Sequence, residues 1–457
     1  MKFLIPKFSK RPLYLTALAG AMLPTGLHAG GYQILEKNAS DLGRAFAGNA
    51  AIAEDATTIG SNPAGLSLLD KAQFSFAIST ISGQAKVELD EAGVFVPGVG
   101  LRSSPGKYKS GNIAPSLPAI PAFYASLPLN EKVAVGFGAF SNFSTGTTYD
   151  QEFAASILAL ESEVQTINLN PSLSYRWSDK LSIGFGLNAV IAEATLSASN
   201  PAIGPLIGAD GAALLNADGA PLIAPTGSSL GYSEIKGDDL GFGWNLGAIY
   251  ELSEFARIGL AYRSPVNMTL VGTSEFRNTP DVDAFTDFNA EAPLDLPDIL
   301  SASAYVRFLP FWSISADVTR TGWSRFQDLQ VYKRTDGSLQ TYVDQNWKDS
   351  YRYALGTTHY YSQQFKLRAG VAYDQSPIPD ATRTFRIPTG DMTWLALGGQ
   401  YRFNQALVLD GGYARLLMNE VPVDDERVFV GQAFTAQARG RSNLSADVFS
   451  LQVSYLL

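Results

Sequence analysis

Hydrophobic and polar residues alternate along extended stretches of this chain. From Ile167 to Trp177, apolar side chains occupy every second position, and Asn, Ser and Arg fill most of the positions between them. Successive side chains of a β-strand point to opposite faces of the sheet, so this period of two predicts a strand. The same pattern returns at 181–191, near residues 244, 312, 365 and 407, and in Phe449–Leu457 at the end of the chain.

The length and composition of these runs favour a strand that crosses a membrane. The runs span roughly 9 to 12 residues, enough for a strand tilted by about 45° to cross a bilayer core. Their polar positions are mostly Ser, Gly, Asn and Thr, and aromatics such as Tyr175, Trp177, Tyr250 and Trp312 recur near the run ends, as in interfacial girdles. A large soluble β-sandwich or solenoid is the alternative. We predict an all-β fold, a transmembrane antiparallel β-barrel, because in lipid only a closed sheet pairs every backbone group.

The connections between runs alternate in length, as such barrels require. Short turns at 178–180 and 403–405 are expected on the periplasmic side, and the long segments 82–112, 145–163 and 197–238 on the outer side. The pattern contains roughly 12 to 16 candidate strands. Weak runs near 328–334 and 428–436 leave the number open.

The first 29 residues have the organisation of a signal peptide. Lys2, Lys7, Lys10 and Arg11 precede an apolar stretch, and Leu27-His28-Ala29 offers a cleavage site with a small final residue. We therefore expect an exported chain. Removal of residues 1–29 takes four of the 34 basic residues and none of the 43 acidic ones, which leaves a formal charge of −13.

Composition excludes several classes of function. The chain contains no Cys, so a disulfide scaffold, a Cys-ligated metal and a thiol enzyme are ruled out. The acidic balance argues against a nucleic-acid partner. His359 would be the only histidine after cleavage, which disfavours an outer-membrane hydrolase built on a Ser and a His. We expect no enzyme activity, no metal and no cofactor.

Three regions depart from a plain barrel. Residues 30–71 are rich in Gly, Ala and Ser, and they precede the first clear strand. We expect them to form a plug, or hatch, inside the barrel, the alternative being a disordered N-terminal arm. Two predicted outer loops are aliphatic, with Phe153, Ile157, Leu158 and Leu160 at helical spacing in the first, and Ile203, Leu206 and Ile207 in the second. Exposed apolar patches usually mark binding sites, so we expect a hydrophobic groove, unless the loops bury these residues against each other or the lumen.

Several segments, in order along the chain, carry a family resemblance. The sequence closely resembles the FadL-type outer-membrane family of long-chain fatty acid transporters, which also includes uptake channels for aromatic hydrocarbons. The matching segments are Ser40–Ala45, Ala51–Ala56, Asn62-Pro63-Ala64, Gly241–Gly247, Trp323–Phe326, Leu367–Pro377, and Arg383 with Pro388. Together they are far more specific than any one of them alone.

The resemblance implies an architecture of 14 strands and a route for the substrate. It implies a hatch that includes Gly43, Arg44 and the Asn62-Pro63-Ala64 turn, and a groove formed by the segments 150–164 and 197–236. Substrate would pass from this groove to a lumen pocket beside the hatch. It would leave sideways at a kink of the third strand, near Ser141-Asn142-Phe143. The implied domains are 1–29 signal peptide, 30–71 hatch and 72–457 barrel.

The cargo remains open at this point. Approximate alignment places the neutral residues Ala198 and Gln330 where fatty acid transporters of this family are expected to carry basic residues. A carboxylate would then need another donor, and the candidates are Arg176, Arg352, Arg368, Lys333 and Arg334. The prediction is passive uptake of long-chain fatty acids or similar molecules by a barrel, expected to be monomeric, that releases them into outer-membrane lipid. The alternatives are a channel for neutral hydrocarbons, such as alkanes and alkylbenzenes, and a general diffusion porin for polar solutes.

Overall fold

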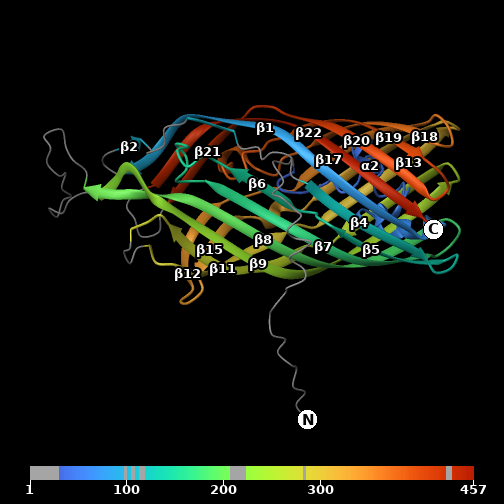
Figure 1. Ribbon diagram of the computed structural model, residues 1–457, viewed down its shortest axis with the longest axis horizontal. Helices are drawn as coiled ribbons and strands as arrows, with labels where there is room; N and C mark the ends of the chain where they lie inside the picture. Colours follow the sequence, from blue (N-terminus) through green and yellow to red (C-terminus); the bar gives the residue numbers. More distant parts are fainter. Residues whose placement is uncertain are drawn as a thin grey trace, which may run out of the picture.

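The computed structural model describes residues 30–457, apart from 97–99, 104–108, 113–118, 206–222, 281–284 and 429–434. The predicted signal peptide, residues 1–29, lies outside this part of the chain. The described residues form a closed antiparallel barrel of 14 spans with its axis along the longest dimension of the molecule (Figure 1). The predicted fold class is therefore confirmed. The barrel closes where β1 (Gln73–Val96) pairs with β22 (Thr435–Leu456).

The strands between these two follow each other around the wall. They are β2 Gly100–Ser103, β3 Ser110–Asn112, β4 Ala119–Pro128, β5 Val133–Phe140, β6 Ser144–Thr148, β7 Glu161–Arg176, β8 Leu181–Pro205, β9 Ile223–Ser253, β10 Ala256–Arg263, β11 Val266–Arg277, β12 Phe288–Leu296, β13 Ile299–Leu309, β14 Trp312–Thr321, β15 Asp328–Lys333, β16 Ser338–Asp344, β17 Ser350–Tyr360, β18 Phe365–Asp374, β19 Met392–Arg402, β20 Leu407–Met418 and β21 Val421–Val428. Several spans consist of two consecutive strands, such as β5 with β6 and β10 with β11, because the backbone leaves the ladder briefly between them.

Alternation along the strands separates the two faces of the wall. In β7, Leu173 is 47% exposed on the outer face, whereas its neighbours Ser172 and Ser174 are buried on the lumen side. At the end of β22, Leu451 and Val453 face outward, and Gln452 faces inward. The period of two therefore places apolar side chains where lipid would surround the barrel.

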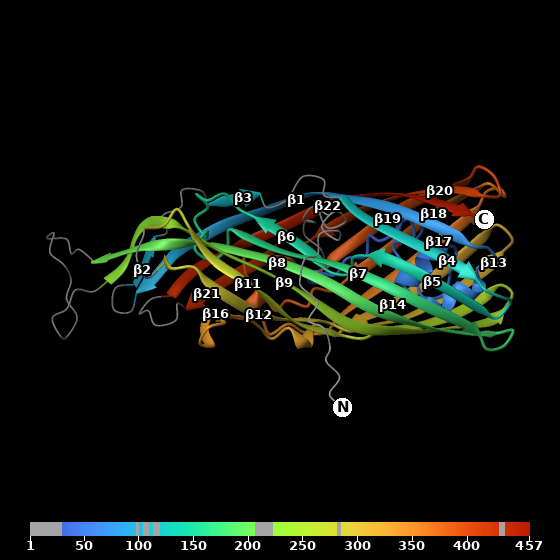
Figure 2. The same ribbon diagram turned by 60° about the horizontal axis from the view of Figure 1, so that its bottom comes forward.

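The N-terminal residues occupy the lumen. Residues 30–69 are almost entirely buried and include α2 (Ala39–Leu42), η1 (Ala56–Gly60) and η2 (Pro63–Leu68). Figure 2 shows this blue segment enclosed by the strands, toward the end of the barrel that carries the C-terminus. Two short 3-10 helices, η4 (Trp323–Arg325) and η5 (Asp380–Thr382), lie outside the hatch. None of the helices in the described residues is long and apolar enough to cross a membrane.

Two expectations about the long connections are wrong. Much of the segments 82–112 and 197–238 continues as paired strand, so that β8 has 25 residues and β9 has 31. Beyond the bilayer a strand needs no apolar face. Its sequence then lacks the alternation of apolar and polar residues from which the strands were predicted. The apolar residues at 153–160 form consecutive turns rather than a helix, and β7 already begins at Glu161.

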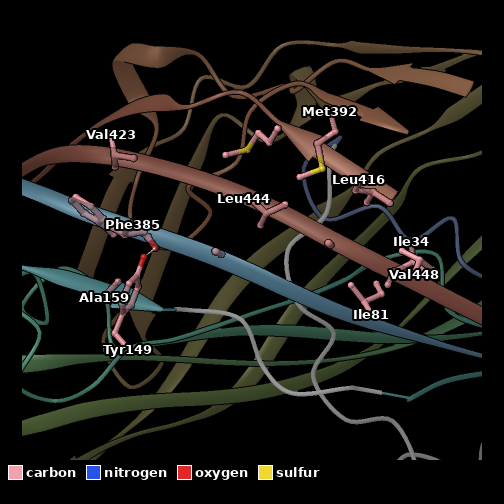
Figure 3. Packing of buried hydrophobic residues seen from close by; sticks show 14 of the residues in the cluster. Ile34, Ile81, Tyr149, Ala159, Phe385, Met392, Leu416, Val423, Leu444 and Val448 are labelled. Carbon is pink, nitrogen blue, oxygen red and sulfur yellow. Dashed lines mark hydrogen bonds between the residues drawn. The ribbon is translucent and has the colours of Figure 1, made fainter. Parts of the chain in front are cut away.

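A hydrophobic cluster joins the turn segment, the hatch and the wall. Figure 3 shows Tyr149 and Phe385 side by side, where the Tyr149 hydroxyl donates to the Phe385 carbonyl at 2.9 Å. The Tyr149 and Phe153 rings stack with their centroids 4.4 Å apart. Further members of the cluster are Ile34 of the hatch and Ile81, Met392, Leu416, Val423, Leu444 and Val448 of the wall. The lumen above the hatch is thus filled mainly by apolar side chains.

Candidate functional site

The third span of the barrel is broken in its middle. β5 pairs with β4 on one side and with β7 on the other. β6, which continues the same span after residues 141–143, forms a ladder with β7 alone among the described residues. Within the described residues, the wall beside β6 therefore lacks the backbone pairing that β5 has on both sides.

The start of the hatch pairs with this break. We call residues 30–38 the strap. Gln33 of the strap forms an isolated antiparallel bridge with Phe143, flanked by hydrogen bonds from Ile34 N to Asn142 O (2.7 Å) and from Ser144 N to Tyr32 O (2.9 Å). The strap thus satisfies backbone groups that a neighbouring strand would otherwise pair.

Side chains of the break also hold it in place. The Thr166 hydroxyl donates to the Phe143 carbonyl at 2.6 Å, and the Ser141 hydroxyl donates to the same oxygen at 3.2 Å. Asn142 Oδ1 accepts a hydrogen bond from Lys37 Nζ of the strap at 2.9 Å. Ser141, Asn142 and Phe143, which were predicted to form the lateral opening, are all buried here.

An aromatic cluster encloses Tyr32 of the strap. The centroid of its ring lies 4.6 Å from that of Trp323, 5.8 Å from that of Trp347 and 6.0 Å from that of Phe143. Gly31 has a positive φ of 75°, and a Cβ at this position would lie only 2.6 Å from Trp347 and 2.9 Å from Trp323. Only glycine fits between these rings, so the strap depends on Gly31 to bring Tyr32 into the cluster.

A mostly apolar cavity of about 90 Å³ lies in the lumen next to this cluster, and Tyr32 forms part of its wall. The residues that line the cavity come from many strands, so no local sequence motif predicts it. Its apolar lining includes Val164, Leu270, Leu294, Phe326, Leu329 and Ile387. Its polar lining includes Ser162, Glu163, Lys236, Glu291, Gln345 and Arg386.

Arg386 supplies a cation to this cavity. It lies in the connection between β18 and β19, and its Nη1 donates to Ser162 Oγ (2.8 Å), Glu161 O (3.1 Å) and Ser197 O (3.4 Å). Burial, together with the nearby charge of Arg427, lowers the pKa of Arg386 to about 10, so it is cationic at neutral pH. All three of these acceptors are neutral.

The other basic candidates from the sequence are not in the cavity. Arg176 pairs with Glu251, Arg352 with Asp374, and Arg368 with Glu54 and Asp410. Arg334 pairs with Glu291, and Lys333 lies over the Phe288 ring. Of the two neutral positions, Ala198 is buried, and Gln330 Oε1 accepts a hydrogen bond from Tyr332.

Sequence reasoning missed Arg386, although it stands between Arg383 and Pro388 of the family pattern. Only the fold of the connection shows that this arginine turns toward the lumen. Arg383 instead donates to the carbonyls of Ile378, Thr389 and Pro422 and pairs with Asp380, so it shapes the connection itself.

The hatch is anchored to the barrel by buried charges. Glu54 accepts from Arg44 of the hatch and from Lys366 and Arg368 of β18, each at 2.9 Å. Burial alone would raise the pKa of Glu54, but the three cations together hold that pKa well below its ordinary value. Gly43 lies directly against Gly398 of β19, where a side chain on either residue would collide with the other's backbone.

The Asn62-Pro63-Ala64 turn is a second anchor. Asn62 caps η2 by accepting from Ala64 N at 3.0 Å, and Ala64 lies against Gly184 of β8. Both anchors lie in the lumen, with Arg44, Asn62 and Ala64 buried.

The predicted groove is placed only in part. Phe153, Ile157 and Leu158 are buried in the lumen cluster, and Leu160 beside them is also buried. Ile203 lies near the end of β8, and Leu206 and Ile207 lie outside the described residues. Whether these residues form a capture groove remains a prediction. No group of three or more His, Cys, Asp or Glu suited to a metal ion occurs in the described part of the chain.

A closed antiparallel barrel with a hatch in its lumen and an apolar cavity beside the hatch defines an outer-membrane transport barrel. Residues 20–456 match the family described as "Outer membrane protein transport protein (OMPP1/FadL/TodX)", and the chain belongs to this family. It is thus an outer-membrane protein of the Gram-negative type, and the named relatives are transport proteins rather than enzymes.

Two relatives illustrate the similarity in sequence. The chain is 34% identical to the long-chain fatty acid transport protein of Escherichia coli O6:H1, over 87% of this chain and 89% of that protein. It is 30% identical to outer membrane protein P1 of Haemophilus influenzae, over 96% and 98% of the two chains.

Two solved structures illustrate the similarity in fold. A Pseudomonas aeruginosa FadL homologue aligns with a TM-score of 0.80 and 23% identity, covering 93% of this chain and 99% of that one. The Ralstonia pickettii toluene transporter TbuX aligns with a TM-score of 0.61 and 18% identity, over 92% and 98% of the two chains. At these identities the likeness concerns the fold.

Proposed function

We propose that this barrel takes up long-chain fatty acids passively and releases them sideways into the outer membrane. One observation carries the proposal: Tyr32, which lines the apolar cavity, belongs to the same strap whose backbone fills the break in the third span. A substrate that displaces Tyr32 from the wall of the cavity would pull the strap from Phe143. Filling the pocket and opening the wall are thereby coupled.

The energetics favour a lateral exit over a path through water. Each CH₂ group removed from water gains about 0.8 kcal/mol, so a C16 chain gains on the order of 12 kcal/mol. A water-filled pore would forfeit that gain in the middle of the route. An apolar cavity that opens directly to lipid retains it, so the movement needs no ATP and no cofactor.

Arg386 favours a carboxylate over a neutral cargo. Its three hydrogen-bond acceptors are neutral, and although the nearby Asp425 favours its charged form, Arg386 forms no ion pair among the described residues and lies at the wall of the cavity. The neutral-hydrocarbon alternative is supported by the rest of the lining, which is mainly apolar, and by relatives in fold that are named toluene transporters. The porin alternative has little support, because the hatch fills the lumen.

Uptake by cells tests the proposal. Cells that lack their own fatty acid transporter, and that express this chain, should accumulate labelled oleate, and unlabelled oleate should compete better than an alkane or an alkylbenzene. Arg386→Gln should remove this preference and leave hydrocarbon competition unchanged. No uptake above that of empty cells, or a large steady single-channel conductance, would contradict the proposal.

Deletion of residues 30–40 tests the role of the strap. The truncated barrel should still assemble and show heat-modifiable mobility on electrophoresis, because the anchors at Glu54 and Asn62 remain. It should fail to take up oleate, since the coupling between cavity and break is lost. Uptake at the rate of the intact chain would refute this role.

A further inference from the structure

Two cations meet where the strap passes the break. Lys37 of the strap and Arg263 at the end of β10 both donate to the carbonyl of Gly60, Lys37 Nζ at 3.4 Å and Arg263 Nη2 at 3.3 Å. Both also lie over the ring of Phe140, at 5.3 Å and 5.6 Å from its centroid. The shared acceptor and the shared ring bring the ammonium and the guanidinium close together inside the barrel.

Neither cation has a carboxylate partner in the described part of the chain. Apart from Gly60, Lys37 donates to Asn142 Oδ1, and Arg263 donates to Asn188 Oδ1. Burial, and after it the charge of Arg263, lowers the pKa of Lys37 to about 7. The nearby carboxylates Asp41 and Glu36 raise this pKa, but to a smaller extent. Two like charges this close inside the barrel are unfavourable, and an anion between them would reduce that cost.

Space for an anion lies beside them. A cavity of about 50 Å³ is bounded by Lys37 and Arg263, and its remaining wall is largely polar, with Asn49, Ser61, Asn245 and Thr319. Two buried side-chain atoms in this wall, Asn49 Oδ1 and Asn245 Nδ2, have no hydrogen-bond partner. The free amide hydrogens of Asn245 suit a carboxylate oxygen.

The surroundings also determine where a hydrocarbon tail would go. Arg263 borders a second, smaller cavity together with Phe143, Val266 and Leu296, which belong to the apolar cluster around Tyr32. A bound carboxylate at Lys37 and Arg263 would therefore direct its chain toward the break. This arrangement fits a single-chain carboxylate on its way out of the barrel.

We propose that Lys37 and Arg263 form a carboxylate-binding site beneath the break, separate from Arg386, which the head group of the fatty acid occupies before lateral release. This inference rests on the proposed function and assigns its last step in the lumen. The Lys37 ammonium also holds Asn142, so a bound carboxylate competes for the hydrogen bond that fastens the strap to the break.

Calorimetric titration of the purified full chain in detergent tests the site, with oleate and its neutral methyl ester as probes. Lys37→Met should weaken oleate binding by at least about tenfold, the worth of a hydrogen bond to a charged group. Methyl oleate should bind as before, and Lys37→Arg should retain oleate affinity. The loss should persist in an Arg386→Gln background. Lys132→Met, in an exposed turn, is the control for loss of one positive charge.

Should Lys37→Met fail to assemble, Lys37→Gln removes the charge and retains a donor for Asn142. Because the chain has no Cys, a single Gln33→Cys variant reports on the strap. Its rate of modification by a thiol reagent should rise with oleate and not with methyl oleate. If oleate affinity is unchanged in the Lys37 variants, or if both probes weaken equally, the carboxylate site is wrong and the proposed function stands. If the unmodified chain binds neither probe, the proposed function fails as well.

Discussion

Asn62 uses both ends of its side chain to join the hatch to the wall. Its Oδ1 caps η2, and its Nδ2 donates to Ala50 O at 2.7 Å and to the carbonyls of Ala248 and Leu260 at 3.2 Å. Gly247 of β9 faces this amide so closely that a Cβ there would overlap with Asn62 Oδ1. The amide of Asn62, together with the space that Gly247 leaves for it, thus fixes the hatch against β9 and β10.

We predict that Gly247→Ala lowers the free energy of unfolding by about 1–3 kcal/mol, because it forces a buried amide from its partners. Asn62→Ala should cost a similar amount, and the double variant should cost less than the sum of the two, because the steric conflict is then removed. The measurement is the temperature at which the heat-modifiable band shifts on electrophoresis. Gly411→Ala is the control, because its Cβ would meet only Leu451 at 3.9 Å. Strictly additive effects would contradict this account of Asn62.

Individual lumen residues were the hardest to predict from sequence. Asn62 was singled out because it belongs to a segment that matches the family, and Ser141-Asn142-Phe143 because the kink that the resemblance implies falls there by position. Arg386, Lys37 and Arg263 were not, because a cation in a barrel sequence looks the same whether it faces a partner carboxylate, water or a cavity. Only the register between distant strands distinguishes these cases.

The break between β5 and β6 is the least regular element of the wall. Ser141 and Asn142 turn their polar groups toward Phe143 O and Lys37 instead of continuing the ladder. β-Branched residues favour continuous strand pairing. The side chains of Ser and Asn instead form hydrogen bonds with nearby backbone groups, in competition with the ladder.

We predict that Ser141→Val combined with Asn142→Thr reduces oleate uptake at least about tenfold, by favouring a continuous third strand and removing the amide that receives Lys37. Initial rates of labelled oleate uptake at equal surface expression provide the measurement. The pair Ser172→Thr and Leu173→Val, in the regular part of β7, is the matched control and should transport normally. Undiminished uptake in the first variant would indicate a route through the barrel that bypasses the break.

Elements that meet lipid were predictable, and those beyond it were not. The alternation in β7, β8 and β22 is local, so the sequence alone places these strands and their short turns. The outer parts of β8 and β9 lack lipid on either face, and their Gly, Ser and Asp residues read as loop. The segment 153–160 has helical spacing, but its apolar side chains pack against Phe385 and the wall, and tertiary contacts override the local pattern.

Across the whole molecule, the hatch contacts the barrel in two different ways, through the ion pairs of Glu54 and through the contact of the strap with the break. Glu54 is bound by three cations deep in the lumen. The strap is held to the break by backbone hydrogen bonds, by the hydrogen bond from Lys37 to Asn142 and by the contact between the Tyr32 and Phe143 rings. Movement of the strap is therefore expected while the rest of the hatch stays in place.

We predict that Glu54→Gln destabilises the assembled protein by about 3 kcal/mol, because it removes the anion shared by two buried arginines and the partly exposed Lys366. Arg44 and Arg368 then keep only Asp41 and Asp410 as partners. The thermal shift of the heat-modifiable band measures the loss. Glu251→Gln is the control: Glu251 pairs with two partly exposed arginines, Arg176 and Arg257, and its loss should cost no more than about 1 kcal/mol. If the two variants lose the same stability, the buried anchor at Glu54 contributes no more than a partly exposed ion pair.

A reversible cross-link between strap and break tests lateral release most directly. Gln33 and Phe143 form a bridge whose flanking hydrogen bonds belong to their neighbours, which is the pairing with the shortest Cα separation and suits a disulfide. Gln33→Cys with Phe143→Cys can be oxidised without interference, since the chain has no other Cys. Ser75→Cys with Ser454→Cys, across the β1–β22 seam, is the matched control, and each single variant controls for loss of the native side chain. The oxidised strap variant should not take up oleate, and reduction should restore uptake, whereas the seam variant should transport in both states. Equal uptake by the oxidised and reduced strap variant would contradict release through the break.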